Sequence, residues 1–295
     1  PPDRTPVDTI AFILLYGLSY GLVLCLIALG LVVTMGLMRV VNLAHGAFAA
    51  IGGYLAISLM QRQGWPYAVA VPAAVLAVAA FGVAAERLLY VHLYKRSDLD
   101  QVLVTIGFNF VVIALLTMWF GPNVTPLDLP AYLKGNIDLG IREFEVYRVV
   151  SAVICLVIIG ALWWVFERTS TGARLRAAVD NRGMAQAMGM NVPLLFSAIF
   201  ALGCGLAALG GILAAPMLPM EPMWPLKHLV LVLVIVALAG HGQVTASVAV
   251  AVIVGLVETA GRYLFPQSGA FLIYLLLIGL IVWRPDGLLA RARTA

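Results

Sequence analysis

Side chains able to do chemistry are few in this sequence and stand apart from one another. The four histidines are spread along the chain, at His45, His92, His228 and His241. None belongs to an HExxH zinc motif, no serine lies in a GxSxG turn, and no cysteine has a second cysteine or a histidine at metal-ligand spacing. We therefore expect neither a metal site nor the catalytic set of a hydrolase.

Phosphate-binding loops of the common type end in a lysine that follows a glycine-rich turn. The sequence has three lysines, Lys95, Lys134 and Lys227, and none follows such a turn. The chain is therefore expected to bind no nucleotide or other cofactor itself. Any energy from a nucleotide would have to come from a partner.

The composition places the chain in a membrane. Hydrophobic residues make up 63% of it, charged residues only 11%, and the mean hydropathy is +1.02. A soluble core of this length would not bury so much apolar surface. The 28 glycines are scattered through the apolar runs, which is typical of closely packed transmembrane helices.

The apolar runs predict an all-α integral membrane protein with eight or nine transmembrane helices in a single domain, residues 1–295. Spans are expected near residues 9–35, 46–60, 67–93, 101–120, 147–166, 194–215, 227–240, 244–262 and 269–283. The second and seventh are shorter than the roughly 20 residues that cross a bilayer, so we expect them to be broken or re-entrant. A similar glycine-rich run precedes each of the two, which suggests an internal repeat.

Charge predicts which loops face the cytoplasm. The loop 167–193 and the C-terminal tail are rich in arginine, so both are expected on the cytoplasmic side. The polar loop 121–147 has more acidic than basic residues and is expected on the outside. If there are nine spans, the amino terminus is expected on the outside as well. The net charge of +4 does not indicate nucleic-acid binding, because no basic residues alternate with aromatic ones.

Three polar features lie within the apolar runs, where they are costly unless paired or facing water. Glu258 precedes Arg262 by four residues, so a helix would pair them on one face; pore lining or a solute contact is the alternative. Asn109 is expected to bridge two packed helices, with a solute contact again the alternative. Glu86 beside Arg87 is expected to anchor the inner end of its span at the interface.

The segment "RVVNLAHG", residues 39–46, interrupts the first long apolar run. We expect Arg39 to hold the cytoplasmic end of the first span, Asn42 and His45 to satisfy backbone groups freed at a helix break, and Gly46 to allow a turn. A contact of Asn42 or His45 with solute is a second hypothesis. The candidates for a hinge or translocation path are Asn42, His45, Gly46, Asn109 and Glu258.

The cytoplasmic loop predicts an amphipathic helical segment over residues 173–188. Asp180 or Asn181 is placed to cap a second short helix that ends at Gly189, and Pro193 follows. The segment could lie on lipid headgroups, or dock into a soluble partner through its small and flexible residues. Those residues are Ala185, Ala187, Met188 and Gly189.

Four stretches, spread from residue 21 to residue 289, carry a resemblance to a known family. They are "GLVLCLIALGLVVTMGLMRVVNLAHGAFAAIGGYLA", "LVTIGFNFVVIALLTMWFGP", "RTSTGARLRAAVDNRGMAQAMGMNV" and "GLIVWRPDGLL". Together they resemble the smaller type of permease subunit of the branched-chain amino acid ABC importer family. The sequence departs from the family where a "GGxGS" turn is usual. Here it reads "LAGHGQVTA", with Ala239 in place of a glycine and Gln243 in place of a serine.

The resemblance implies a multi-pass subunit of the bacterial plasma (inner) membrane that forms half of a translocation path. It also implies partners: a second permease subunit in a heterodimer, two cytoplasmic ATPases that hold ATP and Mg²⁺, and an extracytoplasmic solute-binding protein. Residues matching the family's coupling helix would dock on the ATPase. They are Asp180, Ala185, Ala187, Met188 and Gly189. Relatives of this kind are associated with branched-chain amino acids, urea, short amides and small carboxylates, and the residues do not choose among these.

Two other classes of function stay open at this point. An ion-coupled secondary transporter or channel would need carboxylates deep in its spans, where only Glu258 qualifies, and would leave the cytoplasmic loop unexplained. A membrane enzyme would need a converging set of catalytic side chains, which the sequence does not show.

Overall fold

The computed structural model describes residues 6–38, 40–94, 96–138, 143–239 and 244–267, together with residues 271, 274, 275, 278, 279 and 282. Arg39, residues 240–243 of the "LAGHGQVTA" turn, most of the predicted span 269–283 and the C-terminal tail lie outside the described residues.

Long helices dominate the described part of the chain, which confirms the predicted all-α membrane fold. Six helical segments there are long and apolar enough to cross a bilayer. They are α1 (Pro6–Met38), α3 (Tyr67–Ala85) with its continuation through η2 (Glu86–Tyr90) and α4 (Val91–Leu93), α5 (Asp98–Phe120), α6 (Val146–Arg168), α9 (Val192–Ala214) and α11 (Val244–Leu264).

Two shorter apolar helices lie where short spans were expected. They are α2 (His45–Ile57), prolonged by the π-helical turn η1 (Ser58–Arg62), and α10 (Trp224–Ala239). Each follows a long buried helix, so that α1–α2 in the first half resembles α9–α10 in the second. This arrangement agrees with an internal repeat, which stays a prediction.

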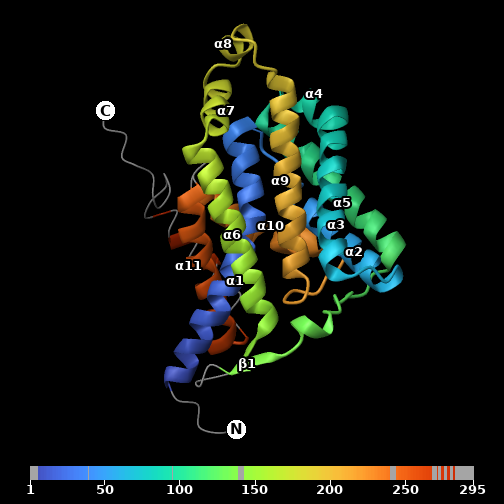
Figure 1. The fold of residues 1–295 in the computed structure, drawn as a ribbon, viewed down its shortest axis with the longest axis vertical. Helices are drawn as coiled ribbons and strands as arrows, with labels where there is room; N and C mark the ends of the chain where they lie inside the picture. Colours follow the sequence, from blue (N-terminus) through green and yellow to red (C-terminus); the bar gives the residue numbers. More distant parts are fainter. Residues whose placement is uncertain are drawn as a thin grey trace.

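The two polar loops lie at opposite ends of the molecule (Figure 1). One carries α7 (Ser170–Asp180) and α8 (Arg182–Ala187). The other carries the short helix η3 (Ala131–Leu133) and an antiparallel hairpin of β1 (Asn136–Asp138) and β2 (Glu143–Glu145), in which Ile137 pairs with Phe144. We call these the α8 end and the hairpin end. Their separation agrees with the prediction that the two loops face opposite sides of the membrane.

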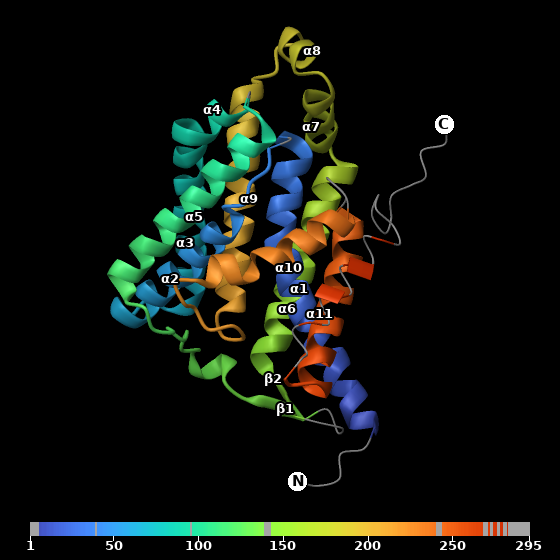
Figure 2. The ribbon, with the colours of Figure 1, turned by 180° about the vertical axis from the view of Figure 1, so that it is seen from behind.

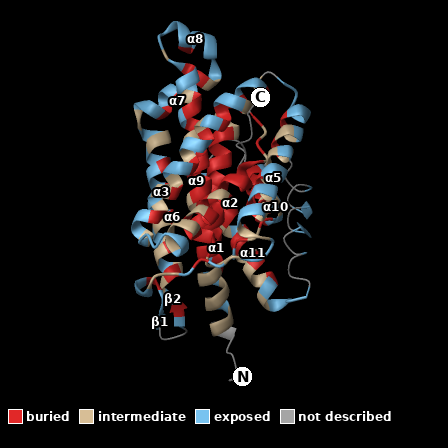
Figure 3. Ribbon diagram, turned by 90° about the vertical axis from the view of Figure 1, so that its right-hand side faces the viewer, coloured by how far each residue is buried: buried red, intermediate tan, exposed pale blue. Residues whose placement is uncertain are grey.

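The core is built around α1 and α9, which run side by side through the centre (Figures 1 and 2). Burial is concentrated along these helices and α2 (Figure 3). In the most apolar window of α1, 83% of the residues are buried, against 22% in α5 and in α6. The exposed residues of α5 and α6 include large apolar side chains such as Leu103, Phe110 and Val157, so these two helices present apolar surface on the outside of the bundle.

Glycines let the central helices touch backbone to backbone. A Cβ atom added at Gly203 of α9 would lie 2.9 Å from the carbonyl oxygen of Gly30 in α1, and one at Gly255 of α11 would lie 2.5 Å from Cα of Gly21. A Cβ at Gly52 of α2 would lie 2.6 Å from Cα of Ala208 in α9. Small residues at such crossings are the usual basis of close helix packing in membranes.

We predict that Gly52→Ala destabilises the protein by about 1–3 kcal/mol, because the added methyl group forces α2 away from α9. The measurement is the apparent melting temperature in detergent. Gly107→Ala is the matched control, since Gly107 also lies in a helix but has no atom within 4 Å of an added Cβ. Equal melting temperatures for the two variants would contradict the assigned packing.

Candidate functional site

The chain between α1 and α2 runs without helical hydrogen bonds through residues 40–44, and α5 supplies the missing partners. The Gln101 Oε1 atom accepts a hydrogen bond from the backbone N–H of Val41 (2.9 Å), and the Thr105 hydroxyl oxygen accepts one from Leu43 N–H (3.2 Å). The Asn109 amide donates to the Leu43 carbonyl oxygen (2.9 Å). The break is therefore held from the side by three residues of one helix, which we call the α5 clamp.

Asn42 and His45 also form hydrogen bonds that hold the break in place. The Asn42 Oδ1 atom accepts hydrogen bonds from Ala44 N–H (3.0 Å) and from the Tyr90 hydroxyl (2.9 Å). The His45 Nε2 atom donates to the carbonyl oxygen of Ile27 in α1 (2.9 Å). Asn42 thus satisfies a backbone group at the break, as expected, whereas His45 ties the start of α2 back to the middle of α1.

Asn42, His45 and Asn109 lie in the core of the subunit. Each has no more than 1% of its surface exposed. Asn109 was expected to join two packed helices; it joins α5 to the break instead. This burial favours an architectural role for the three residues, and a contact with solute stays a prediction.

Gly46 does not form a turn, and that prediction is wrong. It lies in the first turn of α2, and the left-handed glycines of the described chain are Gly64, Gly121, Gly135 and Gly189. A Cβ atom at Gly46 would lie 2.8 Å from the carbonyl oxygen of Pro225. Gly46 is needed because the start of α10 packs directly on the start of α2.

Sequence reasoning missed Gln101 and Thr105, although a signal was present. Together with Asn109 they are spaced by four residues, which places all three on one face of α5. A polar row of this kind in a membrane helix predicts a polar partner on the neighbouring segment. What could not be foreseen was that the partner is backbone.

We predict that Asn109→Leu destabilises the protein by about 1–3 kcal/mol, because the buried Leu43 carbonyl loses its hydrogen bond. Phe110→Leu is the control, since Phe110 is 56% exposed on the same helix. Thermal unfolding in detergent compares the two. A melting temperature of Asn109→Leu equal to that of the control would show that the clamp does not stabilise the break.

Glu258 and Arg262 form the ion pair that the sequence predicted. Arg262 Nη2 lies 2.6 Å from Glu258 Oε1, and the Tyr20 hydroxyl donates to Glu258 Oε2 (3.1 Å). The Glu258 side chain is only 5% exposed, whereas that of Arg262 is 60% exposed. The buried carboxylate is thus fully partnered, and the guanidinium is the accessible half of the pair.

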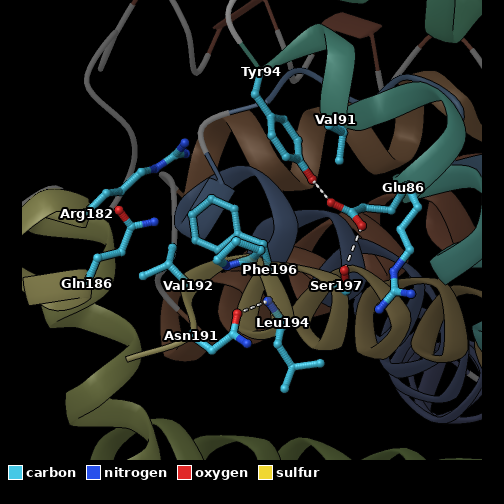
Figure 4. Close-up of a pocket in the computed structure, with 12 residues that line it drawn as sticks. Glu86, Val91, Tyr94, Arg182, Gln186, Asn191, Val192, Leu194, Phe196 and Ser197 are labelled. Atoms are coloured by element: carbon cyan, nitrogen blue, oxygen red, sulfur yellow. Dashed lines mark hydrogen bonds between the residues drawn. The ribbon is translucent and has the colours of Figure 1, made fainter. Parts of the chain in front are cut away.

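Glu86 is not an interfacial anchor, and that prediction is wrong. It begins the π-helical turn η2 and is only 2% exposed. Its carboxylate accepts hydrogen bonds from the hydroxyl groups of Tyr94 and Ser197, the latter at 2.7 Å, and so joins the end of α3 to α9 (Figure 4). Burial and the adjacent carboxylate raise the pKa of Tyr94, which keeps the phenol a donor. Arg87 is exposed, as an anchor should be.

Glu86 lines a cavity of ≈ 470 Å³ between the end of α3 and the loop that carries α8. Arg182 and Gln186 of α8 lie across this cavity from Glu86 (Figure 4). The Arg182 guanidinium stacks on the ring of Phe196, 4.4 Å from its centroid, and its Nη2 atom lies 3.4 Å from the carbonyl oxygen of Met38. Met38 is the last residue of α1, so Arg182 links α8 both to α9 and to the start of the break.

The cytoplasmic loop folds into two helices separated at Asn181. The Asn181 side chain accepts a hydrogen bond from Met184 N–H (2.9 Å) and so caps α8, as the sequence predicted. After α8, Gly189 has φ of 84°, a conformation that favours glycine.

The residues expected to contact an ATPase differ in how far they are exposed. Asp180, Ala187, Met188 and Gly189 are exposed, and Met188 is 77% exposed. Ala185 is only 3% exposed and packs onto its own chain. The surface that α8 offers to a partner is therefore formed by Met184, Ala187, Met188 and Gly189 rather than by Ala185.

Metal-ligating side chains are dispersed in the described part of the chain. No group of three or more His, Cys, Asp or Glu residues lies close enough there to hold a metal ion. Cys25, Cys155 and Cys204 are each buried and not in disulfides.

Known proteins resemble this chain over almost its whole length. Residues 13–281 match the family model described as the branched-chain amino acid transport system / permease component. The chain belongs to this permease family. The permease protein BraD of Pseudomonas aeruginosa, named for high-affinity branched-chain amino acid transport, is 24% identical over 94% of this chain and 95% of its own length.

Two further relatives carry similar names. LivH of Methanocaldococcus jannaschii, a probable branched-chain amino acid transport permease protein, is 24% identical over 89% of this chain and 85% of its own length. LivH of Escherichia coli K12, named as a high-affinity permease protein of that transport system, is 22% identical over 93% of this chain and 94% of its own length. This permease is accordingly a multi-pass protein of the bacterial inner membrane.

A solved structure shares the fold. PsaBC from Streptococcus pneumoniae, determined in complex with Fab, superposes with a TM-score of 0.51 over 93% of this permease and 90% of that chain. The sequence identity is 13%, so the likeness concerns the fold alone.

Proposed function

We propose that this permease forms half of the translocation path of an ATP-driven importer of branched-chain amino acids. Its partners are then a second permease subunit, two cytoplasmic ATPases that bind ATP and Mg²⁺, and an extracytoplasmic solute-binding protein. Family membership and the names of the relatives support the substrate class. The observation that supports coupling to partner ATPases is the exposed surface of α8.

Helix α8 is built to be contacted from outside the bundle. It stands at the extreme end of the molecule, beyond the ends of α1 and α9 (Figures 1 and 2). The exposed apolar residues of α8 and of the turn that follows it include Met184 (63%) and Met188 (77%), next to the small residues Ala187 and Gly189. Flexible methionines beside small residues suit insertion into a groove on a protein. A helix on lipid headgroups would lie along the bundle end with its apolar side against acyl chains.

Two sets of contacts would transmit a movement of α8 to the membrane-spanning helices. Arg182 connects α8 to Met38 at the end of α1, directly before the clamped break. Ser197, near the start of α9, is hydrogen-bonded to Glu86 at the end of α3. An ATPase that displaces α8 would therefore move α1, α9 and α3 together rather than one helix alone.

An ion-coupled secondary transporter is less well supported. Among the described residues, the buried carboxylates are those of Glu86 and Glu258. Each already accepts hydrogen bonds at both oxygens, so neither offers a vacant site for a coupling ion.

We predict that Met188→Glu lowers the affinity of the permease for its ATPases by about tenfold or more, because a charge would be buried in an apolar groove. Binding is measured by co-purification, and transport by leucine uptake into proteoliposomes. Ala177→Glu, at another exposed site on α7, is the control and should assemble normally. Normal assembly and uptake with Met188→Glu would show that α8 is not the docking helix.

We predict that Arg182→Gln leaves ATPase binding intact but lowers ATP-driven uptake severalfold, because the contact between α8 and the end of α1 is lost. Uptake divided by the rate of ATP hydrolysis is the quantity to compare with the wild type. An unchanged ratio would assign Arg182 to structure only.

A further inference from the structure

Charged residues of both signs surround a cavity near the hairpin end. The cavity has a volume of ≈ 390 Å³ and lies between α10, α11 and the segment that follows α9. Its charged residues are Glu221, Lys227, Glu258 and Arg262, and its apolar wall includes Leu218 and Leu231. Pockets of this size hold small organic molecules.

Arg262 lines this cavity, and its ion pair with Glu258 leaves part of the guanidinium accessible. The buried Glu258 carboxylate holds it through one 2.6 Å contact, and Tyr20 takes the other carboxylate oxygen. A guanidinium has five N–H donors in a planar fork. Since the Arg262 side chain is 60% exposed and lines the cavity, further donors are open to a ligand and could bind a carboxylate at two points.

Glu221 contributes a negative charge to the lining of the same cavity, opposite to the charge of Arg262. Its carboxylate lies 2.5 Å from the Lys227 ammonium, and the two side chains are 25% and 58% exposed, respectively. Because the Lys227 side chain is largely exposed, its ammonium can return to water when another ammonium group takes its place on Glu221.

We propose that this cavity binds a zwitterionic amino acid, with its carboxylate on Arg262, its ammonium on Glu221 and its aliphatic side chain against Leu218 and Leu231. A molecule with both charges can pair with Arg262 and Glu221 at the same time, whereas an anion or a simple amine can pair with only one of the two. The inference rests on the proposed function for the transport of amino acids. It adds the residues and the end of the permease at which the solute is held.

The test is direct binding to the full-length permease in lipid nanodiscs, with any co-purifying subunits but without the solute-binding protein. Radiolabelled leucine is competed with leucinamide, which lacks the carboxylate, and with 4-methylpentanoate, which lacks the amine. We expect each analogue to compete about tenfold or more weakly than leucine. Equal competition by either analogue, or no leucine binding up to about 10 mM, would overturn the site.

Two variants test which residue binds the carboxylate of leucine and which binds its ammonium group. Arg262→Gln should lose the preference for leucine over leucinamide, and Glu221→Gln the preference for leucine over 4-methylpentanoate. Glu145→Gln removes an exposed ion pair with Arg148 at the same end and should keep both preferences. If both preferences survive in Arg262→Gln and Glu221→Gln, the cavity is not the binding site.

Failure of this inference differs from failure of the proposed function. If the assembled transporter imports leucine but the analogue preferences are absent, only the site is wrong. If the assembled transporter, supplied with its solute-binding protein and ATP, does not import leucine, the proposed function itself is wrong.

Discussion

Every peptide N–H and C=O group inside a bilayer needs a partner within the protein, and residues 40–44 do not meet this requirement through helical hydrogen bonds. The chain leaves the helical hydrogen-bonding pattern there, between two segments at the centre of the subunit. The α5 clamp meets the requirement with side chains from a helix sixty residues away. The position of α5 against the core therefore depends on a backbone interruption, since its other faces are largely turned outward.

The same interruption lies next to the cytoplasmic loop. Arg182 reaches the last carbonyl of α1, and the clamped segment begins two residues later. In this way a loop that is exposed at the α8 end contacts the last residue of α1, next to a segment whose geometry is not fixed by helical hydrogen bonds. A fully helical connection between α1 and α2 would offer no such place, because each peptide group would already be bonded along the axis.

Interactions between residues a few positions apart in the sequence could be predicted from the sequence. The Glu258–Arg262 pair and the Asn181 cap follow from helix periodicity and local capping, and both are present in the structure. Predictions that needed distant partners were less successful. Glu86 was misassigned because Ser197 and Tyr94, which bury it, are brought there by tertiary packing. Gly46 was misread because the need for a glycine comes from Pro225, nearly 180 residues later.

The glycine contacts between α1, α9 and α11 limit how this permease can change shape. Where backbone touches backbone, no side chain can switch rotamer to accommodate sliding, so a shift along the axis of either helix would bring Cα and carbonyl atoms into collision. We therefore expect the three helices to move together as a single rigid body. Opening and closing of a path is left to movement of this body as a whole and to the less tightly held segments at its edges.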